Sequence, residues 1–204
     1  MKSVSFAIAM VLSTQLFGVV EAASPAKPLV FATEYNQSLP PVGFVKFCAA
    51  NPAECKSVGR RADRLVMQSQ HWAALYEVNT KINTNIAPMS DQELYGEVER
   101  WAYPVDAGDC EDYLLLKKRE LENLGFDSGA LLITVVLDER REGHAVLTVA
   151  TKAGDFILDN RRNEVLLWSE TGYTFLKRQS QQDPRRWMAL TETRNSGGVT
   201  VSGN

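Results

Sequence analysis

Three residues that lie far apart in the chain, Cys110, His144 and Asp159, have the side chains that a cysteine hydrolase needs. Such an enzyme needs a thiolate, a base that exchanges the thiol proton, and a third group that orients the base. Cys110 precedes a helical pattern, and we expect it to begin that helix, where free backbone amides lower the pKa of a thiol. Its own amide hydrogen would point outward as an oxyanion donor. These features favour nucleophilic catalysis at Cys110.

The base must be one of the two histidines, His71 or His144. His71 lies in a helical pattern, and we expect its side chain to be structural or exposed. His144 begins a predicted strand and Asp159 ends the next one, so an antiparallel hairpin would place both side chains on the same face. The position of the turn decides whether they are directly opposite or offset, and the sequence leaves both open. The alternative is a buried cysteine, an exposed histidine and an acid that caps a turn.

Three acids, Asp109, Glu111 and Asp112, crowd the candidate nucleophile. Their negative charge should raise the pKa of the thiol and oppose catalysis, so another feature must offset it. Acids are favoured at the amino terminus of a helix, and three carboxylates with nearby carbonyls also suit Ca²⁺. From local physics, helix capping and a calcium site are equal alternatives. Too few histidines and unpaired cysteines remain for a zinc site.

The elements that must position these residues are helices first and strands second. Helical periodicity covers residues 61–87 and 113–124, with Gly125 as the cap of the second helix, and Ser90 predicts the capped start of a short helical turn. Apolar runs predict strands at residues 130–137, 144–151, 155–158 and 173–178. We therefore expect an α+β fold in which the nucleophile helix packs on an antiparallel sheet. No repeat or linker divides residues 23–204, which predicts a single domain.

The amino terminus has the pattern of a secretory signal. Lys2 is followed by an apolar stretch at residues 6–20 and by small residues, which predicts cleavage after Ala22. Residues 1–22 would then be the signal peptide. An uncleaved membrane anchor is the alternative, although the apolar run is short and interrupted for a span of about 20 residues.

Cysteine usage is consistent with export. Cys48 and Cys55 flank an Asn-Pro turn, and in an oxidising compartment we expect them to form a disulfide that closes a short loop. This pairing leaves Cys110 alone. An odd thiol in a secreted protein is often reactive or intermolecular.

The overall charge excludes one class of partner. The formal net charge is −3, and basic residues are interspersed with acids. Phosphate neutralisation needs clustered Lys and Arg, so we do not expect the chain to bind nucleic acid.

The sequence around the three candidate residues resembles three signature blocks of the bacterial transglutaminase-like cysteine proteinases. The blocks are residues 108–113, 143–147 and 158–160, and the upstream segments 78–79, 82–83 and 94–96 with Trp101 also fit the family pattern. The resemblance covers residues 44–168. It implies a papain- and transglutaminase-like core in which Cys110, His144 and Asp159 form a catalytic triad.

The resemblance also implies a cofactor and partners. Characterised members of the family are periplasmic proteases that need calcium and cleave a large biofilm adhesin near its amino terminus, and an inner-membrane receptor can sequester them. By position, Asp109 and Glu111 match the calcium ligands, with Asp112 a weaker candidate. This chain departs from those members because the stretch between Trp101 and Gly108 is shorter and the tail differs. The substrate and the receptor are therefore not carried over.

We predict a periplasmic, calcium-dependent cysteine endopeptidase that acts as a monomer on a cell-envelope or surface protein. One alternative is another amide hydrolase or acyl transferase, such as a deamidase or a cell-wall peptide hydrolase. The other is a noncatalytic periplasmic binding module with the same fold.

Overall fold

The structure is a computed structural model that describes residues 30–57 and 63–191. The predicted signal peptide, residues 1–22, lies outside the described residues. Within the two described ranges, no helix combines the length and the apolar character that crossing a membrane requires.

A seven-stranded antiparallel sheet forms the centre of the fold, with the strand order β1-β9-β8-β4-β5-β6-β7. The strands are β1 (Gln37–Ser38), β4 (Leu131–Leu137), β5 (Gly143–Thr151), β6 (Gly154–Asp159), β7 (Arg162–Leu167), β8 (Thr174–Gln179) and β9 (Trp187–Ala189). The four predicted strands correspond to β4, β5, β6 and β8. The shorter or more polar β1, β7 and β9 were not predicted, because their patterns do not stand out from those of loops.

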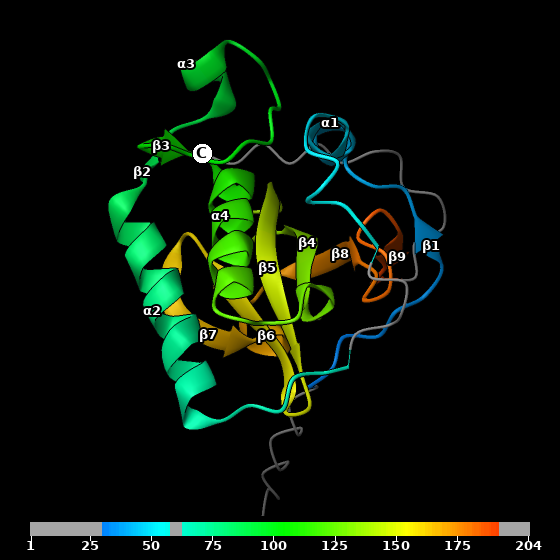
Figure 1. The fold of residues 1–204 in the computed structure, drawn as a ribbon. Coiled ribbons are helices and arrows are strands. Elements are labelled where there is room, and N and C mark those ends of the chain that lie inside the picture. Colours follow the sequence, from blue (N-terminus) through cyan, green and yellow to red (C-terminus); the bar gives the residue numbers. More distant parts are fainter. Residues whose placement is uncertain (1–29, 58–62, 192–204) are drawn as a thin grey trace, which may run out of the picture.

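Helices cover one face of the sheet (Figure 1). They are α1 (Val42–Ala50), α2 (Ser69–Asn85), α3 (Asp91–Tyr95) and α4 (Cys110–Asn123), with short 3-10 helices at Ser128–Ala130 (η1) and Trp168–Glu170 (η2). A small parallel pair, β2 (Ala87–Pro88) and β3 (Ala107–Gly108), lies beside the amino-terminal end of α4. Helix α4 packs against β5, and α2 packs beside α4. The predicted α+β arrangement is therefore confirmed.

Two helix predictions need correction. The helix predicted from residue 61 begins only at Ser69, because residues before it run alongside the sheet, where Leu65 forms a bridge with Thr151. Helix α1 was not predicted, because the prolines before it suggested an extended lead-in; Pro41 instead occupies its N-cap position. The capped turn at Ser90 is confirmed as the start of α3.

The buried apolar side chains explain why α4 lies on the sheet. Leu114, Leu115 and Leu121 of α4 share one core cluster with Leu75 of α2 and Leu147 of β5. Burying such side chains contributes about 1.5–3 kcal/mol each relative to leaving them exposed, less the entropy of ordering them. The carboxyl-terminal end of α4 is followed by Gly125, whose positive φ of 92° is the left-handed conformation that glycine adopts easily.

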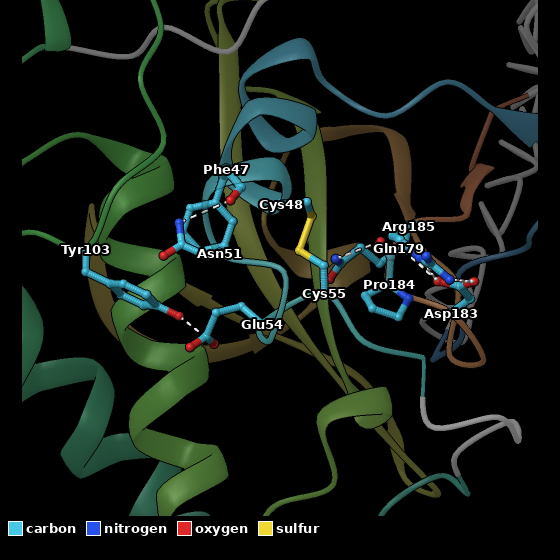
Figure 2. The surroundings of a disulfide bond; sticks show 10 residues. All are labelled: Phe47, Cys48, Asn51, Glu54, Cys55, Tyr103, Gln179, Asp183, Pro184 and Arg185. Atoms are coloured by element: carbon cyan, nitrogen blue, oxygen red, sulfur yellow. Dashed lines mark hydrogen bonds and ion pairs between the residues drawn. A yellow bond between two sulfur atoms is a disulfide. The ribbon is translucent and has the colours of Figure 1, made fainter.

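The predicted disulfide joins Cys48, in the last turn of α1, to Cys55 (Figure 2). The loop it closes contains Glu54, whose carboxylate accepts a hydrogen bond of 2.8 Å from the hydroxyl of Tyr103. Tyr103 lies in the segment that leads into α4. The disulfide loop is thus connected to the chain that carries the candidate nucleophile.

Candidate active site

The hairpin of β5 and β6 brings His144 and Asp159 together. Thr151 pairs with Gly154, which puts the turn at residues 152–153, between the two turn positions considered from the sequence. Leu147 pairs with Leu158, so Asp159 stands beside residue 146 and is offset by two residues from His144 on the same face. The Nε2 atom of His144 lies 2.9 Å from Oδ1 of Asp159, and both side chains are buried.

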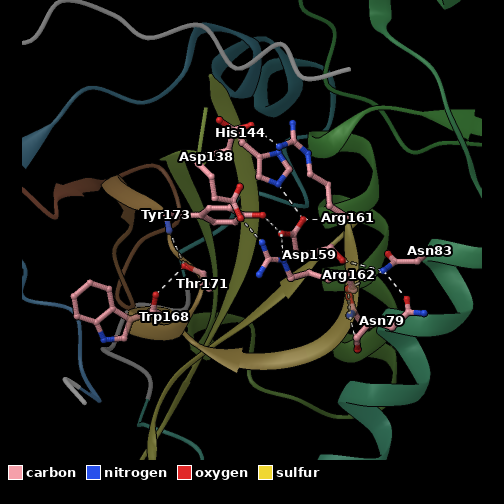
Figure 3. Close-up of polar contacts among 12 residues, drawn as sticks. Asn79, Asn83, Asp138, His144, Asp159, Arg161, Arg162, Trp168, Thr171 and Tyr173 are labelled. Carbon is pink, nitrogen blue, oxygen red and sulfur yellow. Dashed lines mark hydrogen bonds and ion pairs between the residues drawn. The ribbon is translucent and has the colours of Figure 1, made fainter. Parts of the chain in front are cut away.

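The carboxylate of Asp159 is hydrogen bonded on both oxygens (Figure 3). The amide of Arg161 donates to Oδ1 at 3.0 Å, and the hydroxyl of Tyr173 donates to Oδ2 at 2.6 Å. Burial alone would raise the pKa of Asp159. The hydrogen bond and charge of His144, followed by the hydroxyl of Tyr173, outweigh burial and hold this pKa well below its usual value. Asp159 is therefore an ionised carboxylate that orients the imidazole.

Two asparagines of α2 hold the backbone that presents Asp159 (Figure 3). The side-chain amide of Asn83 donates to the carbonyl of Asp159 at 2.9 Å, and that of Asn79 donates to the carbonyl of Arg162 at 2.9 Å. In the sequence these residues were only part of a family pattern. Their spacing of four residues places both side chains on one face of the helix. Through these hydrogen bonds, α2 holds the turn between β6 and β7 in place.

Cys110 is the first residue of α4, as predicted, and its side chain is buried. Its Sγ donates to Oε2 of Glu111 at 3.1 Å, and the backbone amide of Ala145, the residue after His144, slightly lowers the pKa of the thiol. Nδ1 of His144 has no hydrogen-bond partner in the described part of the chain. Helix and hairpin thus place the sulfur beside the strand that carries the imidazole, but the thiol hydrogen is directed to Glu111.

The thiol is surrounded by features that disfavour its ionisation. Burial, the charges of Glu111 and Asp109, and the hydrogen bond to Glu111 raise the pKa of Cys110 well above its usual value. This outcome is the Coulomb effect that the acidic flanks of Cys110 suggested. A reactive thiolate at this position needs positive charge that these side chains do not supply.

A fourth acid, Asp91, joins the cluster at the start of α4. Carboxylate oxygens of Asp91, Asp109 and Glu111 all lie within 4.8 Å of one another. The parallel register of β2 and β3 pairs Pro88 with Gly108, which brings the residues after each strand side by side. Sequence reasoning missed Asp91, because 18 positions separate it from Asp109 and it looks like an ordinary acid in the first turn of α3.

Asp112 makes a contact that the sequence did not predict, and its role as a metal ligand stays a prediction. It lies outside this group of three, and its Oδ1 accepts the amide of Ala102 at 2.8 Å. A Cβ at Gly108 would lie 2.7 Å from its Oδ2, so glycine at that position leaves room for the Asp112 side chain. Asp112 thus anchors the segment that precedes α4, with Oδ2 still without a partner.

The acids are poorly satisfied by the protein alone. Asp91, Asp109, Glu111 and Asp112 are all buried, and each keeps one oxygen that has no hydrogen-bond partner among the described residues. Asp109, at the N-cap position, makes no side-chain capping hydrogen bond, which counts against simple helix capping. Burial raises the pKa of Asp109 to about 6 and that of Asp112 to about 8, and burial and Asp109 raise the pKa of Glu111. Buried, unpaired carboxylate oxygens are suitable ligands for a hard cation such as Ca²⁺.

Two groups in the segment before α4 that could act as oxyanion donors are already engaged. The indole of Trp101 donates to Glu99 at 3.1 Å, and the adjacent amide of Ala102 donates to Asp112. His71, the rejected base, accepts the amide of Gln68 through Nδ1 and so caps α2. The structural role expected for His71 matches this contact.

The family model of the bacterial transglutaminase-like cysteine proteinases matches residues 34–195. The chain belongs to this family. The match extends beyond the range of the sequence resemblance on both sides, and it includes both strands of the hairpin, all of α4 and the Tyr173 segment. Among curated proteins, none matches the chain.

Solved structures of LapG from Legionella pneumophila are similar to this protein. The calcium-bound structure is 22% identical, with a TM-score of 0.50 over 63% of this chain and 74% of that one. The EGTA-treated structure is 24% identical, with a TM-score of 0.50 over 58% and 67%. A further LapG structure is 25% identical, with a TM-score of 0.46, and the match spans 52% of this chain and 62% of that one. The two structures with a TM-score of 0.50 support the fold.

Proposed function

We propose that the protein is an exported cysteine endopeptidase in which Cys110 is the nucleophile, His144 the general base and acid, and Asp159 the orienting group. The observation that carries the proposal is the buried His144–Asp159 pair on a hairpin whose strand β5 packs against α4, the helix that begins at Cys110. Membership of a cysteine proteinase family supports the same assignment.

The hydrogen-bonding state of the two ring nitrogens of His144 determines how the reaction proceeds. Asp159 accepts from Nε2 of His144, so Nε2 carries the hydrogen and Nδ1 has a lone pair for the thiol proton. After the thiol turns from Glu111 to His144, the thiolate attacks a peptide carbonyl carbon and forms a tetrahedral oxyanion. Its collapse breaks the C–N bond, and Nδ1 returns the proton to the leaving amine. Water then hydrolyses the thioester with His144 as base, which restores the thiol.

Calcium is part of the proposal. Asp91, Asp109 and Glu111 would hold it, and Asp112 is close enough in sequence to Glu111 to be tested with them. A bound calcium ion would supply positive charge that offsets the acids and lowers the pKa of the neighbouring thiol. The calcium-bound structure of LapG supports this choice of ion.

We propose the periplasm as the compartment and a cell-envelope or surface protein as the substrate. The Cys48–Cys55 disulfide supports an oxidising compartment. A monomer completes this proposal, and light scattering of the purified protein checks it.

The decisive experiment searches for a new amino terminus. Cell-envelope proteins of the source organism are incubated with the wild-type protein or with Cys110→Ala, with calcium or with a chelator, and new amino termini are identified by mass spectrometry. We expect specific cleavage by the wild type in calcium and a loss of at least about 10⁴-fold in rate for Cys110→Ala. Full cleavage by a folded Cys110→Ala protein would end the proposal.

Two further measurements separate the alternatives. Added amines would be incorporated into the product by an acyl transferase, whereas release of ammonia without a new amino terminus would indicate a deamidase. A noncatalytic module would have an inert buried thiol, so iodoacetamide should then alkylate Cys110 no faster than a model thiol at neutral pH.

A further inference from the structure

We propose that Tyr173 is a positioning residue for the imidazole of His144, acting through both its hydroxyl and its ring. The inference rests on the proposed function, because it assigns a role within that reaction. Tyr173 was part of none of the sequence motifs, other than as the first residue of a predicted strand.

The hydroxyl of Tyr173 determines how the Asp159 carboxylate is turned. It donates to Oδ2 at 2.6 Å, while Oδ1 accepts from Nε2 of His144 at 2.9 Å. A carboxylate held on both oxygens cannot rotate about its Cβ–Cγ bond without breaking one of these bonds. Burial, followed by the charge of Asp159, raises the pKa of Tyr173, so its hydroxyl remains a donor at every pH at which the protein would act.

The ring of Tyr173 packs on the imidazole itself. The two ring centroids are 5.7 Å apart with planes at 85°, an edge-to-face contact that favours one ring orientation. The guanidinium of Arg162 lies 5.1 Å from the centroid of the Tyr173 ring, and its Nε is 3.9 Å from Oδ2 of Asp159. Tyr173 is therefore held between the imidazole and a cation that also interacts with the orienting acid.

The contact between Tyr173 and Asp159 joins strands that are not neighbours in the sheet. Tyr173 immediately precedes β8, and β4 and β5 lie between β8 and β6 in the sheet. The side chain nevertheless reaches Asp159 at the end of β6 (Figure 3). The backbone amide of Tyr173 donates to Oγ1 of Thr171 at 3.2 Å, and that hydroxyl donates to the carbonyl of Trp168. The turn before β8 therefore fixes the position of the Tyr173 backbone.

Together these contacts keep Nδ1 of His144 as the free acceptor. If Asp159 rotated, Nε2 would lose its partner, and the imidazole could adopt the tautomer with a hydrogen on Nδ1, which cannot accept the thiol proton. Tyr173 thus favours the productive tautomer and orientation without touching the reacting atoms.

The test compares Tyr173→Phe, which removes only the hydroxyl, with Tyr173→Leu, which also removes the ring. Tyr76→Phe is the matched control, because Tyr76 is exposed on α2. On the peptide identified by its new amino terminus, we expect kcat to fall about tenfold for Tyr173→Phe and about a hundredfold for Tyr173→Leu, with KM nearly constant. Tyr76→Phe should match the wild type.

A second readout does not depend on activity. In a Cys110→Ala background, the ¹⁵N signals of the two ring nitrogens of His144 report its tautomer. The chain has one other histidine, His71, which His71→Gln removes from the spectrum. We expect distinct Nε2–H and free Nδ1 signals with Tyr173 present and a shift towards averaged signals in Tyr173→Phe.

The outcomes separate this inference from the proposed function. Unchanged kcat and unchanged ¹⁵N signals in Tyr173→Phe would overturn the inference. A lower kcat or melting temperature with unchanged ¹⁵N signals would indicate a merely structural tyrosine and would overturn it as well. If the wild-type protein cleaves no peptide, the proposed function fails, and the ¹⁵N signals alone decide whether Tyr173 orients His144.

Discussion

On the β5–β6 side of the candidate site, both oxygens of the Asp159 carboxylate accept hydrogen bonds. At the start of α4, each of four buried acids keeps an oxygen that has no partner in the described part of the chain. The pKa of Asp159 is held low, while those of Asp109 and Asp112 are raised to about 6 and about 8. The protein alone assembles the His144–Asp159 pair. The four acids near Cys110 need protons or a cation to balance their negative charge.

The difference has a structural origin. His144 and Asp159 are joined by one hairpin, and neighbouring elements supply donors such as Tyr173 and Asn83 to that hairpin. The acids come from α3 and from the start of α4, and within residues 30–57 and 63–191 no Lys or Arg side chain forms an ion pair with any of them. Burying carboxylates without partners is costly, and such an arrangement is retained where a ligand supplies the missing charge.

The largest expected effect tests the His144–Asp159 pair. Asp159→Asn keeps the shape of the side chain but removes the charge that fixes the imidazole, so we expect kcat on the identified peptide to fall about a thousandfold or more. The melting temperature and circular dichroism should show that the variant remains folded. A decrease of less than about tenfold would mean that the His144–Asp159 pair does not control the reaction.

The next largest effect tests the four buried acids at the start of α4 by thermal unfolding. Asp109 and Asp112 have folded-state pKa values above their usual 3.8, so between pH 4 and 8 the folded protein binds more protons than the unfolded chain. Its stability in chelator should therefore fall as pH rises through this window. Calcium at a hundredfold excess over its Kd should restore about 2.7 kcal/mol, or about 5–10 °C in Tm. At a fixed calcium concentration the gain should be larger at pH 8 than at pH 5, because protonation of the acids weakens calcium binding.

A matched pair of variants sharpens this test. Asp91→Asn removes a carboxylate from the cluster, whereas Asp106→Asn removes an exposed one from the preceding segment. We expect Asp91→Asn to reduce the calcium-induced rise in Tm and Asp106→Asn to leave it unchanged. Equal responses of the two variants would remove Asp91 from the proposed site.

The smallest effect concerns Lys117, two turns after Cys110 on α4. Its Nζ is buried and has no hydrogen-bond partner among the described residues, and burial lowers its pKa to about 7. Lys117→Met should raise the free energy of unfolding by about 1–2 kcal/mol at pH 6. Between pH 7 and 10.5 the unfolded wild type binds more protons at this position, so its stability should rise and the gain should shrink. A gain that is constant with pH would contradict this account.

Much of the site was predictable because its parts are local. The β-branched runs of β5 and β6 predicted a hairpin, and both turns considered from the sequence put His144 and Asp159 on one face, whereas a slip of one residue would put them on opposite faces. The exact turn was open, because Thr151, Lys152, Ala153 and Gly154 permit more than one register. The structure decides it through the pairing of Thr151 with Gly154.

The sequence by itself determined the helix that begins at Cys110, the strands that carry His144 and Asp159, the Cys48–Cys55 pairing and the family. Each of these depends on spacing, periodicity or residue type within a short segment. The folded structure was needed to show that Asp91 joins the acids and that Tyr173 reaches Asp159. These contacts join segments that are distant in the chain, so they depend on strand order, register and the packing of helices, which no local pattern encodes.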